Sequence, residues 1–528
     1  MALEDAFLAD ILEHPDDDTP RLVYADWLDE QAATRGGDEA AGLAARAEFI
    51  RVQCRLEQTA EDDPHSPELE DRAAELDRIW GPRWARPFHN RADRWSFRRG
   101  FIEEGWLSAS QFLGGAGRLL RRSPVRSVHL RDARNMRGLI ASPLLRRLAS
   151  LDLSFNNLID GDVRLLAACA TLQNLTTLDL GHNDIRDDGV EDLASSPHLP
   201  NLTSLELSFN RGITDRGARA LAASPRLGRL NSLGLSFCWV SLEGARAVVT
   251  SRLLEGLRTL GLGGCALGNE MLAALLALPH VGRFHGLSLD GNGIGLAGAQ
   301  ALAECVSLRE LTRLSLHGNT IGNIGTEALA SSPQLSHLTE LDLHGNGVGP
   351  AGVQALASSP HLAGLTCLFL SECPLGQAGA EALVSSPHLT RLSELYLNGS
   401  QLGDGGTRVL AASPLLSRLR FLQLAGNGIS DEGARALAAS PYLSRLTGLR
   451  LDGNSIGNAG AAALATSPAL PRLSWLCLEA NDIDDEGAIA LAASPHLERL
   501  TQLSLRYNPI DDRGREALQR RFGQRLEL

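Results

Sequence analysis

A short phrase of leucines constrains this chain more than any other feature. From Leu148 to Ile510 the pattern L-x-x-L-x-L-x-x-N/C-x-I/L returns fourteen times, at a period of 27 residues that lengthens once to 28. The first repeats begin at Leu148, Leu175, Leu202 and Leu230, and the last begins at Leu500. A unit this short cannot bury its own apolar face, so it has to stack on its neighbours. We therefore expect one long array with extended surfaces.

Each repeat predicts a strand, a turn and a helix. In residues 446–468, Leu449 and Leu451 alternate with polar or small residues, the period-2 pattern of a strand with one buried face. Asn454 follows at the turn, where its amide can satisfy backbone groups that would otherwise be buried without partners. Apolar residues at helical spacing come next, and Ser467-Pro468 ends the helix because the residue before proline is pushed out of the α region.

The turn position holds asparagine in ten repeats and a small residue that can form hydrogen bonds in the others. Those others are Cys238, Cys265, Cys373 and Ser400. Because Cys238 and Cys265 hold the same position in adjacent repeats, a disulfide between them is conceivable, but we favour reduced core cysteines. The eight cysteines of the chain lack C-x-x-C spacing and predict no disulfide framework.

Strands and helices that alternate in one direction require right-handed crossovers, which place the strands in one parallel sheet with the helices outside. At roughly 4.8 Å between strands, fourteen strands would line an inner arc of about 60 Å, long enough to engage a folded domain. Residues 148–510 resemble the leucine-rich repeats of the ribonuclease-inhibitor-like class, and Gly433–Ala438 is similar to its G-A-x-A-L-A helices. The resemblance implies an α/β leucine-rich-repeat solenoid, a horseshoe with a concave parallel sheet and convex helices. Known members of the class bind proteins or activate small GTPases.

Two flanking regions complete this arrangement. The last residues, 511–528, predict a C-terminal helix and cap. The first region, residues 1–77, predicts a helix in segment 15–28, with Asp18 or Thr19 as N-cap and Pro20 early in the first turn. A second helix is expected through residues 46–53, after a loop rich in Gly and Ala at 34–42. The pair resembles the bacterial repeat-companion domain, a small N-terminal module found ahead of repeat arrays.

An arginine-rich stretch, residues 78–147, joins the helical region to the repeats. It carries 16 Arg against 4 acids, whereas residues 1–77 carry 6 Arg against 22 acids. Its segment Arg98–Glu104 resembles the joining segment of the same family, whose strand would begin the horseshoe and cover the edge of the first repeat.

The basic stretch could also bind nucleic acid through phosphate contacts and base stacking. The aromatic residues interleaved with its arginines are Trp80, Trp84, Trp95 and Phe97. We favour pairing with the acidic neighbour instead, because a chain with a net charge of -13 would repel a polyanion.

Composition excludes several kinds of chemistry. All 50 basic residues are arginine, so the chain has neither a Schiff-base lysine nor a P-loop lysine. Residues Met1–Asp5 lack the basic region of a signal peptide, and no apolar run approaches the length of a membrane span. We expect a cytoplasmic protein that uses no membrane and no cofactor.

Two glycine motifs imitate a dinucleotide-binding fingerprint. Gly293-x-Gly295-x-x-Gly298 and Gly347-x-Gly349-x-x-Gly352 each follow a predicted strand and open a helix. A solenoid has no point where the strand order reverses, so we interpret both motifs as glycines of the repeat. The Ser-Pro pairs between Ser142 and Ser494 resemble phosphorylation sites but fall at helix ends, and we interpret them as helix stops.

One polar constellation could hold a metal ion. Asp290, His317 and His344 share one outward position in three consecutive repeats, with Asp342 close by. At roughly 5 Å spacing, imidazoles and carboxylates could share a divalent cation. Neighbouring polar residues on a solvated sheet are the commoner arrangement, so we expect neither a metal nor a catalytic residue here.

Outward aromatic residues are the best candidates for binding. Phe369 and Tyr396 hold the same outward position on adjacent strands, and Phe421 and Trp475 lie two positions earlier in later repeats. A core built of leucine needs no aromatic residues facing outward, and such side chains are the usual hot spots of interfaces.

An acidic column is expected at the other end of the array. Asp152, Asp179 and Glu206 hold one outward position in consecutive repeats and should attract an Arg-rich or Lys-rich surface. Three further aromatic residues lie beside the turn position, where they often only line the edge: Phe155, Phe209 and Phe237.

The sequence thus predicts a non-enzymatic scaffold that binds a folded protein on its concave sheet. One alternative is a regulator of a nucleotide switch, such as a GTPase activator, which only the class resemblance suggests and which needs an Asn or Arg that reaches a bound nucleotide. A second alternative is a metal-dependent or nucleic-acid-binding protein that uses the sites described above.

Overall fold

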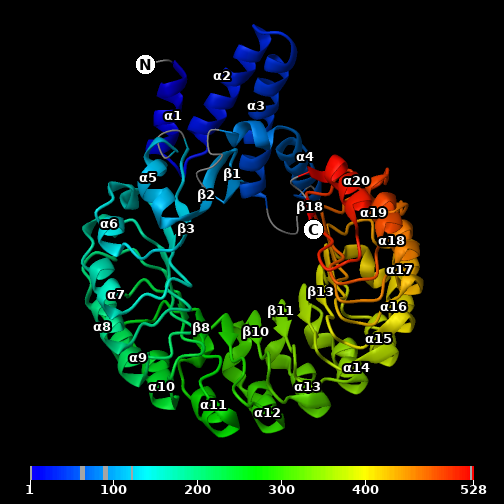
Figure 1. The fold of residues 1–528 in the computed structure, drawn as a ribbon. Helices are drawn as coiled ribbons and strands as arrows, with labels where there is room; N and C mark the ends of the chain where they lie inside the picture. The colour runs from blue at the N-terminus through cyan, green and yellow to red at the C-terminus, as the bar shows by residue number, and fades with distance from the viewer. Residues whose placement is uncertain (1–2, 60–65, 87–92, 120–122, 524–525) are drawn as a thin grey trace. The chain divides into compact units, whose positions relative to one another are not determined.

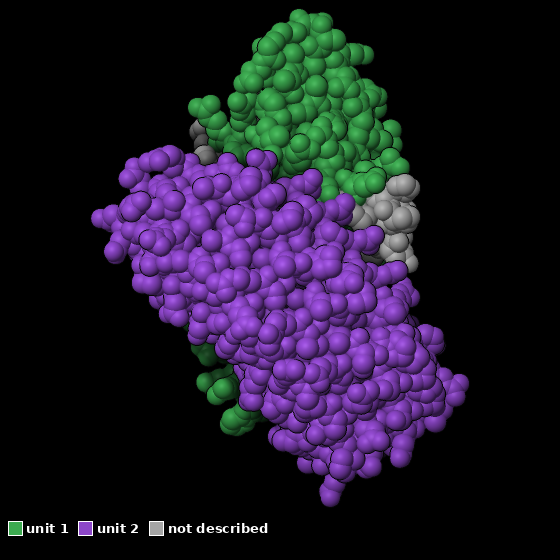
Figure 2. All heavy atoms as spheres, turned by 90° about the vertical axis from the view of Figure 1, so that its right-hand side faces the viewer, with its two compact units in different colours: residues 1–239, 251–257 green, residues 240–250, 258–528 purple. Residues whose placement is uncertain are grey.

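The computed structural model describes residues 3–59, 66–86, 93–119, 123–523 and 526–528. The chain divides into two compact units, coloured in Figure 2: unit 1 contains residues 1–239 and 251–257, and unit 2 contains residues 240–250 and 258–528. Within each unit, successive parallel strands alternate with helices on the outer side (Figure 1). The predicted fold class, an α/β solenoid preceded by a mainly helical region, is confirmed.

Unit 1 begins with four helices and a hairpin. These are α1 (Leu3–Glu13), α2 (Thr19–Ala33), α3 (Gly37–Gln58), α4 (Ser66–Trp84), β1 (Arg94–Arg98) and β2 (Phe101–Ser108). Pro20 lies in the first turn of α2, as predicted, where its missing N–H breaks no helical hydrogen bond. Asp18 is the N-cap residue, although its side chain makes no capping bond.

The predicted loop at 34–42 is wrong, because α3 already begins at Gly37. Gly37 has a φ of +64°, a conformation that glycine adopts readily, and the chain turns there directly from one helix into the next. Asp38 and Glu39 then lie in the first turn of α3, where acidic side chains interact favourably with the helix dipole. Alanines, the best helix formers, follow them.

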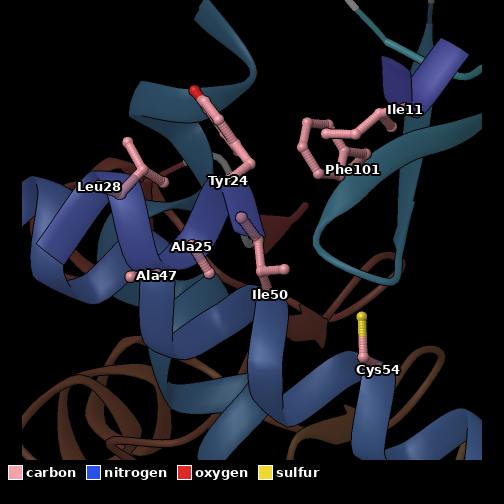
Figure 3. Packing of buried hydrophobic residues seen from close by; sticks show 8 residues of the cluster. All are labelled: Ile11, Tyr24, Ala25, Leu28, Ala47, Ile50, Cys54 and Phe101. Atoms are coloured by element: carbon pink, nitrogen blue, oxygen red, sulfur yellow. The ribbon is translucent and has the colours of Figure 1, made fainter. Parts of the chain in front are cut away.

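The first helices and the joining region share one apolar core (Figure 3). Its buried members are Ile11, Tyr24, Ala25, Leu28, Ala47, Ile50, Cys54 and Phe101. Phe101 belongs to β2, whereas Tyr24 belongs to α2 and Ile50 to α3. Strand β2, within the arginine-rich stretch, is therefore packed against the helical region that precedes it.

A half-buried arginine lies beside this core. The guanidinium of Arg46 lies 4.8 Å from the ring centroid of Trp84 and 5.5 Å from that of Phe97. Burial lowers the pKa of Arg46 to about 10. Trp84 and Phe97, two of the aromatic residues considered for base stacking, pack instead against buried Phe49.

The strand beside the first repeat differs from the one predicted. After α5 (Ala109–Leu119), β3 (Ser127–Arg131) pairs in parallel with β4 (Ser150–Asp152), the first strand of the fourteen repeats. β2 pairs in parallel with β3 and antiparallel with β1, so Arg98–Glu104 contributes to a hairpin one strand further out. Two short helical segments precede β4, namely α6 (Met136–Ile140) and η2 (Pro143–Arg147).

Unit 1 continues through the first four repeats. Their elements are β4 (Ser150–Asp152), α7 (Asp160–Ala167), η3 (Ala170–Leu172), β5 (Thr177–Asp179), α8 (Asp187–Ser195), β6 (Ser204–Glu206), α9 (Asp215–Ala222) and β7 (Ser232–Gly234). The central leucine of each strand aligns with that of the next, as in the pair Leu151 and Leu178. Because side chains alternate along a strand, a one-residue slip would expose every leucine of the row.

Unit 2 carries the remaining repeats. Its first elements are α10 (Leu242–Thr250), β8 (Thr259–Gly261), α11 (Gly268–Leu276), η4 (Val281–Arg283), β9 (Gly286–Ser288), α12 (Leu296–Glu304), η5 (Val306–Glu310), β10 (Arg313–Ser315), α13 (Gly322–Ala330), η6 (Pro333–Leu335), β11 (Glu340–Asp342), α14 (Pro350–Ser358) and η7 (Pro360–Leu362). Those that follow are β12 (Cys367–Phe369), α15 (Gly376–Val384), β13 (Glu394–Tyr396), α16 (Gly403–Ala411), η8 (Pro414–Arg418), β14 (Phe421–Gln423), α17 (Asp431–Ala438), β15 (Gly448–Arg450), α18 (Asn458–Ala465), β16 (Trp475–Cys477), α19 (Asp485–Ala492) and β17 (Gln502–Ser504). The unit ends with α20 (Asp512–Phe522) and β18 (Leu526–Glu527), a short strand that pairs with β17 and that the sequence did not predict.

The turn asparagines form a ladder of hydrogen bonds between repeats. The side-chain amide of Asn183 donates to the carbonyl oxygens of Leu153 and Leu180, and its oxygen accepts the N–H groups of Asn156 and Leu158. One buried amide thus satisfies backbone groups of two repeats, as predicted. In the repeats without asparagine the thiols of Cys238 and Cys373 donate to the equivalent carbonyl oxygens.

A second ladder links the helices. The Asp431 Oδ1 atom accepts the N–H groups of Gly457 and Gly460 at the start of the next helix. Equivalent Asp or Asn side chains act in the same way at Asp160, Asp187, Asn269, Asn323, Asp404, Asn458 and Asp485. Each of these residues therefore caps the helix of the following repeat, where unpaired N–H groups would otherwise remain.

The same contact explains the glycines of the apparent dinucleotide fingerprints. A Cβ atom at Gly298 would lie 2.7 Å from Asn269 Oδ1, and one at Gly352 would lie 2.9 Å from Asn323 Oδ1. Glycine is needed there because the capping side chain of the preceding repeat occupies the space. Both motifs are therefore parts of the repeat, as predicted.

A third ladder closes the other end of the helices. The hydroxyl group of Ser467 donates to the carbonyl oxygen of Ala438, one repeat earlier, at 2.6 Å, and Ser332 donates to Ala303 at the same distance. Ser196, Ser224, Ser359, Ser386, Ser440 and Ser494 make the equivalent bond. The interpretation of these Ser-Pro pairs as helix stops is confirmed, because each serine lies one or two residues beyond the end of its helix and its hydroxyl group is engaged in the fold.

Two further predictions concern the chain as a whole. All eight cysteines are free thiols, Cys238 and Cys265 included. Within the described ranges, no helix is both long enough and apolar enough to cross a membrane.

Candidate interaction surfaces

The outward face of each strand is built from residues on either side of a buried leucine. In β13, for example, Leu395 is fully buried, whereas Glu394 and Tyr396 on either side of it are partly exposed. Because neighbouring strands are in register, equivalent outward residues form rows that cross the sheet. Chemistry on this face therefore depends on which residues fall into one row.

Four outward aromatic side chains of unit 2 form a continuous cluster, the aromatic patch: Phe369, Tyr396, Phe421 and Trp475. Phe369 and Tyr396 are paired in register and stack with ring centroids 4.1 Å apart. Tyr396 and Phe421 are 6.3 Å apart, and Phe421 stacks on Trp475 at 5.2 Å. The structure thus brings together all four residues that the sequence predicted as binding anchors.

A glycine lets two of these rings meet across an intervening strand. Phe421 and Trp475 each align with Gly448 in β15. A Cβ atom at Gly448 would lie 2.1 Å from Phe421 Cε2, so the ring covers the glycine backbone. The absence of a side chain at this position keeps the patch continuous.

Carboxylates lie beside Phe369 and Tyr396 in the aromatic patch. The Tyr396 hydroxyl donates to Glu394 Oε2 at 2.6 Å, and the Cys367 Sγ atom lies 3.7 Å from the same oxygen. Burial, followed by the Glu394 carboxylate, raises the pKa of both the Tyr396 hydroxyl and the Cys367 thiol. Neither group is therefore a ready nucleophile, and the arrangement suits binding better than acid-base or covalent chemistry.

The acidic column of unit 1, Asp152, Asp179 and Glu206, is in register across three strands. Burial and the charges of its two neighbours raise the pKa of Asp179 to about 6. Glu206 extends over Gly234 in the next strand, where a Cβ atom would lie 2.0 Å from its Oε2 atom. The column therefore concentrates three carboxyl groups on one strip of the sheet.

A histidine that the sequence analysis missed closes one end of the acidic column. His129 in β3 lies 2.7 Å from Asp152 Oδ2 through Nδ1 and 2.8 Å from Glu104 Oε1 through Nε2. The bond to Asp152, together with that to Glu104, raises the pKa of His129. Burial opposes ionisation of Asp152, but the bonds from His129 and Ser154 outweigh it and lower the pKa of that carboxyl group.

His129 belongs to a repeat in which valines replace two of the leucines, so the leucine pattern does not reveal it. Val125, Val128 and Leu130 are buried in the positions that leucines hold elsewhere, and His129 falls between them in the outward row. A search that tolerated valine in the leucine pattern would have extended the array to β3.

The candidate metal ligands are engaged in hydrogen bonds. Asp290 Oδ2 accepts the Ser288 hydroxyl at 2.8 Å, and its Oδ1 atom accepts the Ser315 hydroxyl and the His317 N–H group. The ring centroids of His317 and His344 lie 4.2 Å apart, with the ring planes inclined by 47°. Among the described residues, no group of three or more His, Cys, Asp or Glu side chains could hold a metal ion.

The arginine-rich stretch pairs with the acidic region, as we favoured. Arg98 forms a two-bond pair with Glu57 at 2.8 and 2.7 Å, and Arg83 lies 3.0 Å from Asp38. Arg126 pairs with Asp16, and Arg99 lies 3.5 Å from Asp18. In the reverse sense, buried Arg21 of the helical region donates to Glu103 of the joining stretch at 2.6 Å. Four arginines of the basic stretch are thus compensated by the acidic region: Arg83, Arg98, Arg99 and Arg126.

An aromatic row at the turn edge of unit 1 is more regular than the sequence suggested. Phe155, His182, Phe209 and Phe237 stack as one column, the aromatic ladder, with successive ring centroids 4.0, 3.9 and 4.3 Å apart. Adjacent planes are inclined by no more than 14°. The three phenylalanines are the predicted edge residues, and His182, which joins them into one column, was not predicted.

Comparison with known proteins identifies the repeats. Seven stretches match the family model described as leucine rich repeat: residues 171–194, 198–222, 334–357, 418–438, 444–465, 478–492 and 496–518. A search of curated proteins finds no match.

Several solved structures are similar to this chain at low identity. A TLR13–ssRNA13 complex is 20% identical, with a TM-score of 0.40 over 77% of this chain and 56% of the other, so this chain spans little more than half its length. An internalin (inlF) from Listeria monocytogenes is 20% identical, with a TM-score of 0.35 over 68% of this chain and 81% of the other. A complex of Rad7 and Elc1 in yeast is 17% identical, with a TM-score of 0.45 over 68% of this chain and 81% of the other.

Proposed function

Because the chain is a leucine-rich-repeat protein, we propose that it is a non-enzymatic scaffold that binds a folded partner protein on the outward face of its strands. The observation that carries this proposal is the aromatic patch, in which four large rings from non-consecutive positions meet on a face that needs none for its core. Aromatic side chains that lie together at a surface are typical hot spots of protein interfaces.

The energetics of the repeat support this choice of face. Leucines and the three ladders satisfy the interior of each repeat in the same way, so the outward strand residues can vary without loss of the fold. Helices on the opposite side are small and uniform, as in Gly433–Ala438. Variation within a constant frame is where specificity can reside.

The surroundings of the patch favour a protein partner over a nucleic acid. Glu340, Asp342 and Glu394 lie near Phe369 and Tyr396, and their carboxylates would repel phosphates. The turn asparagines, which a nucleotide-switch regulator would need as free side chains, are engaged in the ladder. Neither alternative gains a specific observation in its favour.

We also propose the domain organisation that the sequence predicts. Residues 1–77 would form a repeat-companion type of domain, 78–147 the joining and N-capping region, 148–510 the repeats and 511–528 the C-terminal cap. The ion pairs between the first two regions and the pairing of β18 with β17 support these roles. Eight free thiols support a reducing compartment such as the bacterial cytoplasm.

The test of this function compares partner capture by three proteins from an extract of the native cell. These are the wild type, Phe369→Ala combined with Tyr396→Ala, and the helix-face control Arg435→Ala, where the side chain is exposed in α17. We expect the aromatic double variant to lose its partners, because truncation of a buried interface aromatic costs about 2 kcal/mol or more. The control should keep them.

Thermal unfolding of all three proteins is the matched check, since only variants that melt alike can be compared. A double variant that keeps every partner, while Arg435→Ala loses them, would place binding on the helices and refute the proposal. Capture that requires added divalent metal, or that nuclease treatment abolishes, would support one of the alternatives instead.

A further inference from the structure

The aromatic ladder of unit 1 is an exposed apolar surface with no role in the core. Phe155 at one end is 70% exposed, and Phe209 within the ladder is 38% exposed. The rings stack on one another. Burial of the interior does not require such rings, because Leu316 and Leu343 are fully buried beneath equivalent turns that carry Gly318 and Gly345.

These side chains are held in a conformation that does not favour them. Phe155, His182, Phe209 and Phe237 have φ values of +58°, +53°, +61° and +56°, the left-handed region in which a Cβ atom is disfavoured. Seven repeats of unit 2 use glycine at the equivalent position: Gly264, Gly291, Gly318, Gly345, Gly399, Gly426 and Gly453. The fold therefore accepts glycine here, and the four ring-bearing residues of unit 1 are not required by the backbone.

The acidic column runs beside the ladder. Asp179 Oδ1 accepts the N–H group of Gly181, and His182 of the ladder is the next residue along the chain. In the following repeat Glu206 Oε1 accepts the N–H group of Ser208, and Phe209 comes next. The two rows are thus three residues apart along each strand, at most about 10 Å.

Between the two rows lie small residues, two of which carry hydroxyl groups. The residues that separate column from ladder are Ser154, Gly181 and Ser208. Within the described part of the chain, no arginine or histidine pairs with Asp179 or Glu206, in contrast to Asp152, which pairs with His129. A strip of uncompensated negative charge therefore faces solvent alongside a strip of exposed rings.

We propose that the aromatic ladder and the acidic column together hold a basic amphipathic segment of a partner protein. This inference rests on the proposed function and names the kind of segment that unit 1 accepts. Arginine or lysine side chains on one flank of the segment would face Asp179 and Glu206, and apolar side chains on the other flank would pack on the ladder. Complementary charge selects the sign of the segment, and the rings add apolar contact area.

A helix fits the spacing of the two rows. It is about 10 to 12 Å wide, which matches their separation, and its turns rise about 5.4 Å, close to the roughly 4.8 Å between strands. When the helix axis lies across the strands, each helical turn presents one basic residue to the acidic column and one apolar residue to the aromatic ladder. A segment of about ten residues would span the four repeats of unit 1 that carry the ladder.

The test uses full-length protein and a synthetic helical peptide of about 14 residues, with arginines along one flank and leucines along the adjacent flank. Fluorescence anisotropy measures its affinity, with the same peptide carrying glutamate in place of arginine as the charge control. We expect the basic peptide to bind at least about tenfold more tightly than the acidic one and to weaken as salt is raised.

Two sets of substitutions distinguish the contribution of the acidic column to peptide affinity from that of the aromatic ladder. Asp179→Asn with Glu206→Gln removes the charge, and Phe155→Gly, His182→Gly, Phe209→Gly and Phe237→Gly together remove the rings at positions whose backbone suits glycine. Each set should lower affinity by about tenfold or more while the melting temperature stays close to that of the wild type. Phe369→Ala with Tyr396→Ala, in unit 2, should leave peptide affinity unchanged.

The outcomes distinguish this inference from the proposed function. If the glycine set melts far lower or keeps full affinity, the ladder is a structural device and the inference is overturned. It is also overturned if the peptide binds without regard to charge, or if a single-stranded oligonucleotide binds more tightly and loses affinity with the ladder. Loss of peptide binding in the unit 2 variant would show that the peptide binds to the aromatic patch instead.

Discussion

At the scale of single residues, the stability of this molecule depends on side chains that serve two repeats at once. Asn346 is buried, with its amide donating to the carbonyl oxygen of Leu316 and its oxygen accepting the N–H group of Ile321. Asp342, four residues earlier, faces outward, and burial raises the pKa of its carboxyl group. Asn346 thus links backbone groups of two repeats, whereas Asp342 Oδ1 accepts the N–H group of His344 within its own repeat.

We therefore expect Asn346→Ala to destabilise the protein by about 1 to 3 kcal/mol, because it leaves buried backbone groups without partners. Asp342→Ala should cost less than Asn346→Ala, because the Asp342 side chain is only partly buried and lies within one repeat. Denaturant titration of both variants measures the contrast. Equal losses would mean that the inward and outward positions have been assigned wrongly.

At the scale of the helices, glycine has an unusual role. In α18 a Cβ atom at Gly460 would lie 2.7 Å from Asp431 Oδ1, which holds the cap of that helix from the preceding repeat. In α7, by contrast, a Cβ atom at Gly161 would meet nothing within 4 Å. The two helix glycines therefore offer a matched pair.

Replacement of a helix glycine by alanine ordinarily stabilises a protein by up to about 1 kcal/mol. We expect this for Gly161→Ala, but the opposite sign for Gly460→Ala, where the new methyl group displaces the cap and costs about 1 kcal/mol or more. The midpoint of urea unfolding reports both signs. A stabilised Gly460→Ala protein would rule out the capping ladder as a source of stability.

Sequence patterns predicted the structural elements that are determined by residues of a single repeat. The strands, the turn asparagines and the ends of the helices follow from local periodicity and hydrogen-bonding chemistry, and the structure has them where the pattern placed them. The capping ladder escaped because its partners, such as Asp431 and Gly460, lie in different repeats and become neighbours only on stacking. The loop predicted at 34–42 failed because glycine and alanine together suit a helix as well as a loop.

The candidate sites divide in the same way. Equivalent positions in a regular array predicted that the four rings of the aromatic patch and the three acids of the column would align. The contribution of Gly448, which lets Phe421 reach Trp475, was not foreseen because it depends on ring direction. His129 was not predicted because valines replace leucines in the repeat that contains it.

At the scale of the whole molecule, each unit carries its own chemistry on the strand face. Unit 1 has an acidic column with an aromatic ladder at its edge, and unit 2 has an aromatic patch bordered by carboxylates. The leucines and ladders are common to both, so the differences lie almost entirely in outward side chains. A binding protein built on repeats would place its specificity there.

The most direct test of this claim is to place a photoreactive benzophenone side chain on the strand face and on the helix face, and to measure cross-linking to the captured partner. Gln423, which pairs in register with Tyr396 in the aromatic patch, provides the first position without removing an anchor, and exposed Arg435 provides the second. We predict an efficient cross-link from position 423 and almost none from position 435. Cross-linking from position 435 alone would contradict the assignment of the strand face as the binding surface.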